Sequence, residues 1–295
     1  MKPITRILWF VPIVLVVGYA LTFYWLSETE NDHVYPLSTE MQPLQYGVTC
    51  TPVVLLTNDG MRLSAWAMPD TVGAHSRIWV LFLHGSGGNI STRSQLYSKL
   101  IQRGYYVLAL DYRGYGQSEG EPGETGLYLD ANAAYEYLVR NLQVPEHHIV
   151  IFGKSLGAAV AINLATYADA GGVIVEEAFT SLVDRAQELY PIFPVRKVMK
   201  NRFDCLSRIT QVGMPKLFIH AIDDDVIPID HGRRLFEIAP PPKTFVEVRG
   251  GHNDAYLSDE KGYFGGFTKF VRDVTSDTSN TAAEVHPPPV IPENH

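Results

Sequence analysis

The sequence predicts an α/β fold built on a mostly parallel sheet of about eight strands. From residue 78 onward, nearly continuous apolar runs alternate with segments that have the periodicity of helices. Such runs are typical of parallel strands that helices cover on both faces. Before them, residues 46–57 and 61–68 have the pattern of two strands, and Asn58-Asp59-Gly60 between them is typical of a hairpin. We therefore expect two antiparallel strands followed by about six parallel ones.

The expected parallel strands are short, and helices or loops separate them. They cover residues 78–85, 105–114, 148–157, 171–179, 216–225 and 243–251. Residues 180–213 interrupt the alternation, because Pro191 and Pro194 break their helical patches. We expect this segment to form a short helical cap above the sheet.

Composition supports one folded domain at residues 46–274. The chain has 295 residues, of which 46% are hydrophobic and 19% are charged, and its net charge is −8. It has no cluster of Lys and Arg, which argues against nucleic-acid binding. No metal-ligand spacing such as C-x-x-C or H-E-x-x-H occurs, so we expect neither a metal nor a cofactor. Cys50 and Cys205 are expected as separate buried thiols, although an exported domain could pair them. Residues 275–295 are polar and then Pro-rich, and we expect a disordered tail.

The N-terminus predicts a membrane anchor. Residues 7–26 carry no charge, and a helix of that length spans the hydrocarbon core of a bilayer. Basic residues in 1–6 favour a cytoplasmic N-terminus, with the folded domain outside, in the periplasm if the source is Gram-negative. A cleaved signal peptide is the alternative, but cleavage at Gly18-Tyr19-Ala20 would leave an apolar stub. We therefore favour a single-pass signal-anchor, with residues 27–45 as a polar linker.

The candidate nucleophile is Ser155. The strand at 148–157 ends in Gly153-Lys154-Ser155-Leu156-Gly157, the G-x-S-x-G pattern of a nucleophile elbow. In this sharp turn between a strand and a helix, the serine points toward a histidine base, and its neighbours are glycine because a Cβ would collide with adjacent backbone. The apolar strand before the pattern and the helix-forming run after it supply the context that the motif needs. We interpret Lys154 as structural.

The base and the acid are expected at the ends of later strands, in the chain order Ser, Asp, His. His252 follows Gly250-Gly251 after the strand at 243–251 and is the expected base. Asp224 is the preferred acid, although Asp223 and Asp225 beside it stay open. Together with Ser155 these residues predict a catalytic triad.

An oxyanion hole and a substrate pocket complete the predicted site. The backbone N–H groups of Ser86 and Leu156 are the expected oxyanion donors. His84, before Ser86, is expected to brace that loop from behind. The cap residues Tyr190, Ile192 and Phe193 are equally consistent with lining an acyl pocket and with simple cap packing. Glu176 and Glu177 end a strand near the site, where they either pack under the cap or bind a substrate amine.

Five segments together resemble the α/β-hydrolase superfamily, and in particular its membrane-anchored branch with bud-emergence-type and palmitoyl-protein thioesterase-like members. They are GKSLG, DYRGYGQSEGEPGETGLYLDANAAYEYL, AFTSLVDRAQELYPIFPVRKVMKNRFD, HAIDDDVIP and GGHND. The resemblance covers about residues 46–272 and implies an α/β-hydrolase fold. The family's acid lies four residues before the proline of its G-x-x-D-x-x-V-P turn, and counting back from Pro228 gives Asp224. The loop HGSGGN, which is H-G-N-A-G-N in the family, places Ser86 at the oxyanion position. The cysteine-rich N-terminal segment of the thioesterase members is absent, so depalmitoylation does not carry over.

These observations predict a membrane-anchored serine hydrolase of the carboxylesterase, thioesterase or lipase kind. It would cleave an ester or thioester of a small-molecule or lipid-like acyl substrate through an acyl-enzyme intermediate, without a cofactor. One alternative is a serine aminopeptidase with the same triad, in which Glu176 and Glu177 bind the substrate amine. Another is a non-catalytic binding module tethered to the membrane. The sequence leaves the oligomeric state open.

Overall fold

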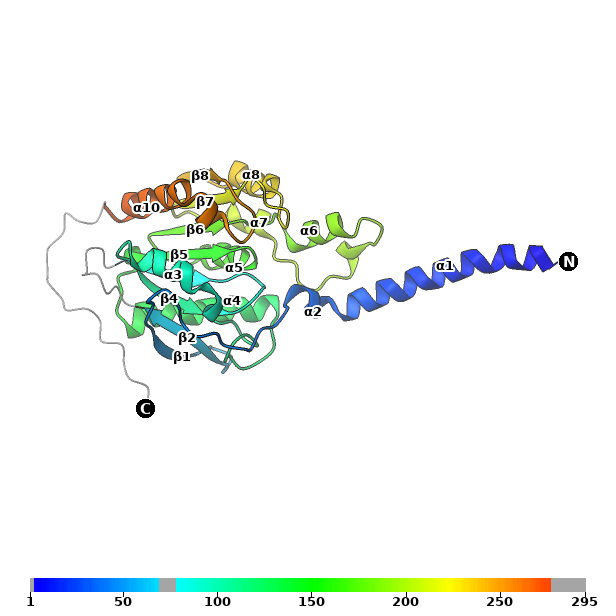
Figure 1. The fold of residues 1–295 in the computed structure, drawn as a ribbon, viewed down its shortest axis with the longest axis horizontal. Helices are drawn as coiled ribbons and strands as arrows, with labels where there is room; N and C mark the ends of the chain where they lie inside the picture. Colours follow the sequence, from blue (N-terminus) through cyan, green and yellow to red (C-terminus); the bar gives the residue numbers. More distant parts are fainter. Residues whose placement is uncertain (1–2, 69–77, 277–295) are drawn as a thin grey trace.

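The computed structural model describes residues 3–68 and 78–276 of the chain (Figure 1). Eight strands form one sheet in the order β1-β2-β4-β3-β5-β6-β7-β8. β2 pairs antiparallel with both β1 and β4. The strands that follow in the sheet, β4, β3, β5, β6, β7 and β8, are all parallel to one another. The predicted sheet, with its antiparallel start, is confirmed. The strands are β1 (Thr51–Leu56), β2 (Arg62–Met68), β3 (Trp79–Leu83), β4 (Tyr106–Leu110), β5 (Ile149–Lys154), β6 (Gly172–Glu176), β7 (Lys216–Ala221) and β8 (Lys243–Val248).

Helices cover both faces of the sheet, so every residue of the central strands β3 to β7 is buried. One apolar core packs under α4 (Glu124–Glu136) and α5 (Leu156–Leu164). The other packs under α3 (Ser94–Ile101) and α10 (Glu260–Ser276). This burial explains why the strands are apolar at successive positions instead of alternating. Outside the cap and the N-terminal segment, the other short elements are η1 (Ile90–Arg93), η2 (Tyr137–Asn141), η3 (Glu146–His148), α8 (Ile229–Ile238) and α9 (Ala255–Ser258).

The segment expected as a cap contains α6 (Leu182–Leu189), η4 (Val195–Lys197) and α7 (Cys205–Ile209). Ser181 begins α6 by accepting a hydrogen bond from the N–H of Asp184, as is typical of a helix N-cap. α6 lies beyond the edge of the sheet at which the parallel strands end, on the side where α1 leaves the domain (Figure 1). α7 returns to the core, where Cys205 and Ile209 are fully buried. Cys50 and Cys205 are both free thiols, as expected, but only Cys205 is buried; Cys50 is half-buried, against the expectation.

The N-terminal segment consists of α1 (Pro3–Glu28) and α2 (Glu30–Val34). α1 projects from the domain as one long helix, and α2 lies against the domain (Figure 1). Across residues 3–68 and 78–276, no helix combines the length and the apolar character that a membrane crossing requires. The anchor at 7–26 and the linker at 27–45 stay predictions. The predicted tail lies outside the described residues except for 275 and 276, which end α10.

Candidate active site

The nucleophile elbow holds Ser155 in a backbone conformation that non-glycine residues rarely adopt. Its φ is 55° and its ψ is −117°, at the turn from β5 into α5. The flanking glycines are required by space. A Cβ on Gly157 would lie 2.0 Å from the carbonyl oxygen of Leu83, and one on Gly153 would lie 2.2 Å from that of Gly157. The G-x-S-x-G spacing therefore follows from close contact between β5, β3 and α5.

Ser155, His252 and Asp224 form a hydrogen-bonded relay. The Oγ of Ser155 lies 3.1 Å from Nε2 of His252, and Nδ1 of His252 lies 2.7 Å from Oδ2 of Asp224. The other carboxylate oxygen of Asp224 accepts the backbone N–H groups of Val226 and Ile227, at 2.9 and 2.8 Å. Burial pushes the pKa of Asp224 upward, but the hydrogen bonds from His252 and Ile227 outweigh it and hold this pKa below its ordinary value. Asp224 is therefore ionised at neutral pH.

The three adjacent aspartates have different surroundings. Asp223 and Asp225 are exposed, whereas Asp224 is buried against the imidazole. Ser155, His252 and Asp224, the three residues predicted to form a triad, lie together in the structure. Of the three adjacent aspartates, Asp224 is the one that contacts His252.

The loop after β3 runs beside the nucleophile. A Cβ on Gly85 would lie 3.3 Å from the Cβ of Ser155, and Ser86 and Leu156 line the same pocket as Ser155. Leu156 is the first residue of α5, where backbone N–H groups lack partners within the helix and can bind a negative oxygen. His84 is fully buried behind the loop, with its ring 4.7 Å from that of Tyr112. The oxyanion role of the two N–H groups stays a prediction.

A pocket of about 330 Å³ opens at Ser155. The three cap residues expected to bind substrate separate there: Tyr190 lines the pocket, Ile192 is 72% exposed, and Phe193 is buried against the rings of Tyr19 and Phe23. No sequence pattern marks the pocket residues that come from α1 and α2. The lining residues are Leu26, Glu30, His33, Val34, Ser86, Ser155, Leu156, Phe179, Leu182, Arg185, Ala186, Leu189, Tyr190, Val195, Met199, Val226 and Ile227.

Comparison with known proteins identifies the family. Residues 74–181 match the family described as serine aminopeptidase, S33. An uncharacterized protein of Mycobacterium tuberculosis is 35% identical over 88% of this chain and 92% of its own length. The alpha/beta hydrolase domain-containing protein WAV2 of Arabidopsis thaliana is 31% identical over 85% of this chain and 89% of its own. The chain belongs to the α/β-hydrolase superfamily.

Two further similarities concern a relative named for its location and a solved structure with the same fold. A Saccharomyces cerevisiae relative named as an uncharacterized membrane protein is 32% identical over 75% of this chain and 79% of its own length. The crystal structure of the Pyrococcus furiosus esterase Pf2001 matches with a TM-score of 0.67 at 18% identity, covering 80% of this chain and 97% of the esterase. At that identity the likeness shows the fold.

A buried ion cluster lies beneath the hydrolase triad. Nζ of Lys154 is 2.7 Å from Oε1 of Glu176 and 2.5 Å from Oε2 of Glu177, and all three side chains are buried. The hydroxyl of Tyr263 donates to the other oxygen of Glu176 at 2.8 Å. Burial alone would lower the pKa of Lys154, but the two carboxylates raise it. Lys154 is thus a structural residue that compensates buried acidic groups.

Glu177 is a second carboxylate beside the catalytic imidazole. Its Oε2 lies 3.3 Å from Nδ1 of His252, and its Oε1 has no hydrogen-bond partner within the described part of the chain. Burial raises the pKa of Glu177 to about 9 against the opposing charge of Lys154. The pKa of Glu177 is therefore raised whereas that of Asp224 is lowered, so Asp224 is the carboxylate beside His252 that ionises more readily. Although atoms of these three residues lie within 4.8 Å of one another, a cation there would have to displace the proton on Nδ1.

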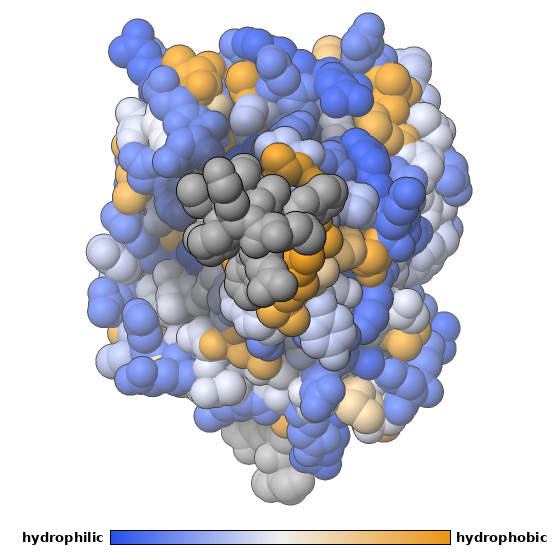
Figure 2. All heavy atoms as spheres, turned by 90° about the vertical axis from the view of Figure 1, so that its right-hand side faces the viewer, coloured by the Kyte–Doolittle hydropathy of each residue, from blue (hydrophilic) through white to orange (hydrophobic). Residues whose placement is uncertain are grey.

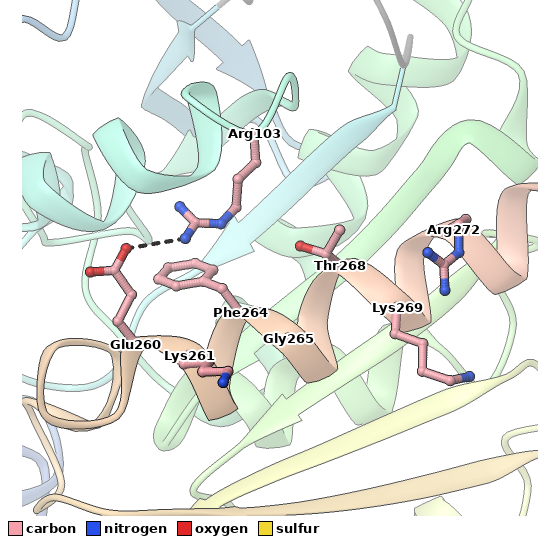
Figure 3. Close-up of a pocket in the computed structure, with 8 residues that line it drawn as sticks. All are labelled: Arg103, Glu260, Lys261, Phe264, Gly265, Thr268, Lys269 and Arg272. Atoms are coloured by element: carbon pink, nitrogen blue, oxygen red, sulfur yellow. Dashed lines mark hydrogen bonds and ion pairs between the residues drawn. The ribbon is translucent and has the colours of Figure 1, made fainter.

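A larger hollow of about 730 Å³ lies away from the triad, between α10 and the end of α3 (Figure 3). Its wall is largely charged, and Arg103 there lies over the ring of Phe264 and pairs with Glu260. Of the described residues that line this hollow, none belongs to the triad. The chemistry of the site therefore belongs to the smaller, apolar pocket.

Proposed function

We propose that this protein is a serine hydrolase that cleaves carboxylic esters or thioesters of acyl substrates. The observation that supports this best is the relay of Ser155, His252 and Asp224 at the inner end of an apolar pocket. A relay alone would also suit a peptidase. The apolar walls favour a substrate whose acyl part is a hydrocarbon chain, because burying such a chain removes apolar surface from water.

The mechanism follows from the relay. Oγ of Ser155 attacks the carbonyl carbon while its proton passes to Nε2 of His252, and Asp224 stabilises the resulting imidazolium. The N–H groups of Ser86 and Leu156 stabilise the oxyanion. The leaving alcohol or thiol takes the proton from Nε2 as its bond to carbon breaks, which leaves an acyl-enzyme. Water then attacks the acyl carbon and gives one proton to Nε2. As the bond between the acyl carbon and Oγ breaks, Nε2 returns that proton to Oγ, which releases the carboxylic acid and restores Ser155.

We also propose, from the charge-free run at residues 7–26 and not from the described helices, that the N-terminal segment attaches the enzyme to a membrane, with the N-terminus on the cytoplasmic side and the hydrolase domain on the other. The charge-free run at 7–26 and the yeast relative named as a membrane protein support this location. A lipid-like acyl substrate fits it, because such molecules concentrate at membranes.

Aminopeptidase activity, suggested by the name of the matching family, has less support. Glu176 and Glu177, the carboxylates expected to hold a substrate amine, are at most 1% exposed, pair with Lys154 and do not line the pocket. Glu30 does line it, but its carboxylate accepts backbone N–H groups of Lys200 and Asn201. Among the described residues that line the pocket, none therefore offers a free carboxylate to a substrate amine.

Labelling with a fluorophosphonate probe tests the proposal. The wild-type full-length protein should be labelled, Ser155→Ala should not, and the exposed-serine control Ser207→Ala should label like the wild type. Replacing Ser155 or His252 by Ala should reduce hydrolysis of p-nitrophenyl esters by about 10⁴-fold or more. Equal turnover in Ser155→Ala would disprove the mechanism. Cleavage of aminoacyl naphthylamides in preference to acyl esters would support the peptidase instead. Absence of labelling in a folded wild type would support the binding module.

A further inference from the structure

We propose that the N-terminal segment at residues 26–34 is part of the substrate site itself, where it forms one wall of the acyl pocket and sets the length of chain the enzyme prefers. This proposal rests on the proposed function. Leu26 from α1 and Val34 from α2 line the pocket that contains Ser155, and they do so together with Leu182 and Leu189 of α6. A segment expected to act only as an anchor and linker therefore reaches the reacting centre.

Buried hydrogen bonds hold this wall in place. Glu30 is 8% exposed, and its carboxylate accepts the backbone N–H groups of Lys200 and Asn201 at 3.0 and 2.8 Å. The side-chain amide of Asn201 donates to Glu30 and to Asn31, both at 2.9 Å, and its oxygen accepts from the hydroxyl of Tyr35 at 2.7 Å. A buried carboxylate is stable only when it is bonded in this way, so the wall is a fixed part of the fold.

Aromatic contacts fasten α1 to the tip of the cap. The ring of Phe193 stacks on those of Tyr19 and Phe23, with centroids 4.9 and 5.9 Å apart. The hydroxyl of Tyr19 also donates to the carbonyl oxygen of Ile192 at 2.9 Å. Because the same cap supplies Leu189 and Tyr190 to the opposite wall, α1 and the cap together fix the width of the pocket.

The chemistry of the walls selects an apolar chain. The charged members of the lining are engaged elsewhere: Glu30 bonds the backbone, and Arg185 donates to the carbonyl oxygen of Val226 and to Glu188. The rim is apolar as well, since Leu189 and Tyr190 are 57% and 37% exposed. On the face from which α1 projects, Figure 2 shows hydrophobic residues beside the projecting segment, and α1 itself carries exposed apolar residues such as Val16 and Leu21. An acyl chain can therefore pass from Ser155 between α6 and the N-terminal segment toward this face.

Filling the pocket with a larger side chain tests whether the N-terminal segment forms one of its walls. In the full-length enzyme, Leu26→Trp and, independently, Val34→Trp should lower the ratio of kcat/KM for p-nitrophenyl dodecanoate to that for the acetate by at least tenfold. Leu21→Trp is the matched control, because Leu21 lies on the same helix, is 62% exposed and does not line the pocket. Its ratio should stay within twofold of the wild type. If both pocket variants keep the wild-type ratio while folding normally, the proposal is wrong.

Binding without turnover separates this inference from the proposed function. Full-length Ser155→Ala should bind dodecanoate, and adding Leu26→Trp should weaken that binding by at least tenfold, measured by calorimetric titration. Weaker binding in the double variant would support the role of the N-terminal segment as a pocket wall even if no ester is hydrolysed. Missing turnover would then count only against the proposed function. Equal dodecanoate affinity with and without Leu26→Trp would overturn the inference.

Discussion

Replacing Glu177 by Gln should stabilise the protein, and the gain should grow with pH. In the folded protein burial raises the pKa of Glu177 from its ordinary 4.5 to about 9, so folding takes up a proton wherever the pH lies between these values. The stability that this group contributes is complete below its unfolded pKa and falls as pH rises toward the folded one. Each pH unit in that window costs the wild type at most about 1.4 kcal/mol. Gln has nearly the same shape and needs no proton.

The predicted quantity is a slope. The free energy of unfolding of Glu177→Gln minus that of the wild type should increase with pH from 5 to 8, by at most about 1.4 kcal/mol per pH unit, and level off above that. Urea unfolding at pH 5, 7 and 9 measures it, with the exposed Glu237→Gln as a control that should change stability by less than about 0.5 kcal/mol. A difference that is constant with pH, or that shrinks as pH rises, would refute the assignment of a raised pKa to Glu177.

Two further predictions concern the triad and the elbow. Asp224→Asn should lower kcat for ester hydrolysis by about 10⁴-fold, as measured by steady-state kinetics. The exposed neighbour Asp223→Asn should stay within about threefold of the wild type. Equal losses of kcat in the two variants would mean that the hydrogen bond from His252 to Asp224 is not the one that catalysis uses. Gly157→Ala should destabilise the domain by about 3 kcal/mol or more in thermal unfolding, because its Cβ would lie 2.0 Å from a backbone oxygen. Gly87→Ala, where nothing lies within 4 Å, should change stability by less than about 0.5 kcal/mol, and similar losses at both positions would contradict the steric argument.

Features that depend on short stretches of chain could be predicted from the sequence. A parallel strand buried on both faces needs consecutive apolar residues, and a nucleophile elbow needs glycine on both sides of the serine. Both patterns appear in a few neighbouring residues, such as those around Ser155. Because parallel strands end at one edge of the sheet, the positions of Asp224 and His252 after their strands were enough to place them beside it.

Features that depend on contacts between distant segments could not be predicted in this way. Glu30 reaches Asn201 across 171 positions of sequence, and no local pattern marks that pairing. Phe193 is an aromatic cap residue, as expected of a pocket residue, yet its ring packs against α1. No sequence pattern indicated that contact. The sequence places Glu177 at the end of a strand. Only the packing shows that Lys154 forms an ion pair with its carboxylate and that this carboxylate faces the imidazole of His252.

The buried contact between Glu30 and Asn201 has a practical consequence for how the enzyme is handled. A shortened form that starts after residue 34 would keep every member of the triad, and it would still be expected to react with small electrophilic probes. It would lack Leu26, Glu30, His33 and Val34, so one side of the pocket would be open to water. Screening such a trimmed protein for its natural substrate would therefore measure the preferences of a different binding site. If the N-terminal segment is the pocket wall and the membrane attachment proposed above, its proteolytic loss in the cell would alter both the selectivity and the location of the protein.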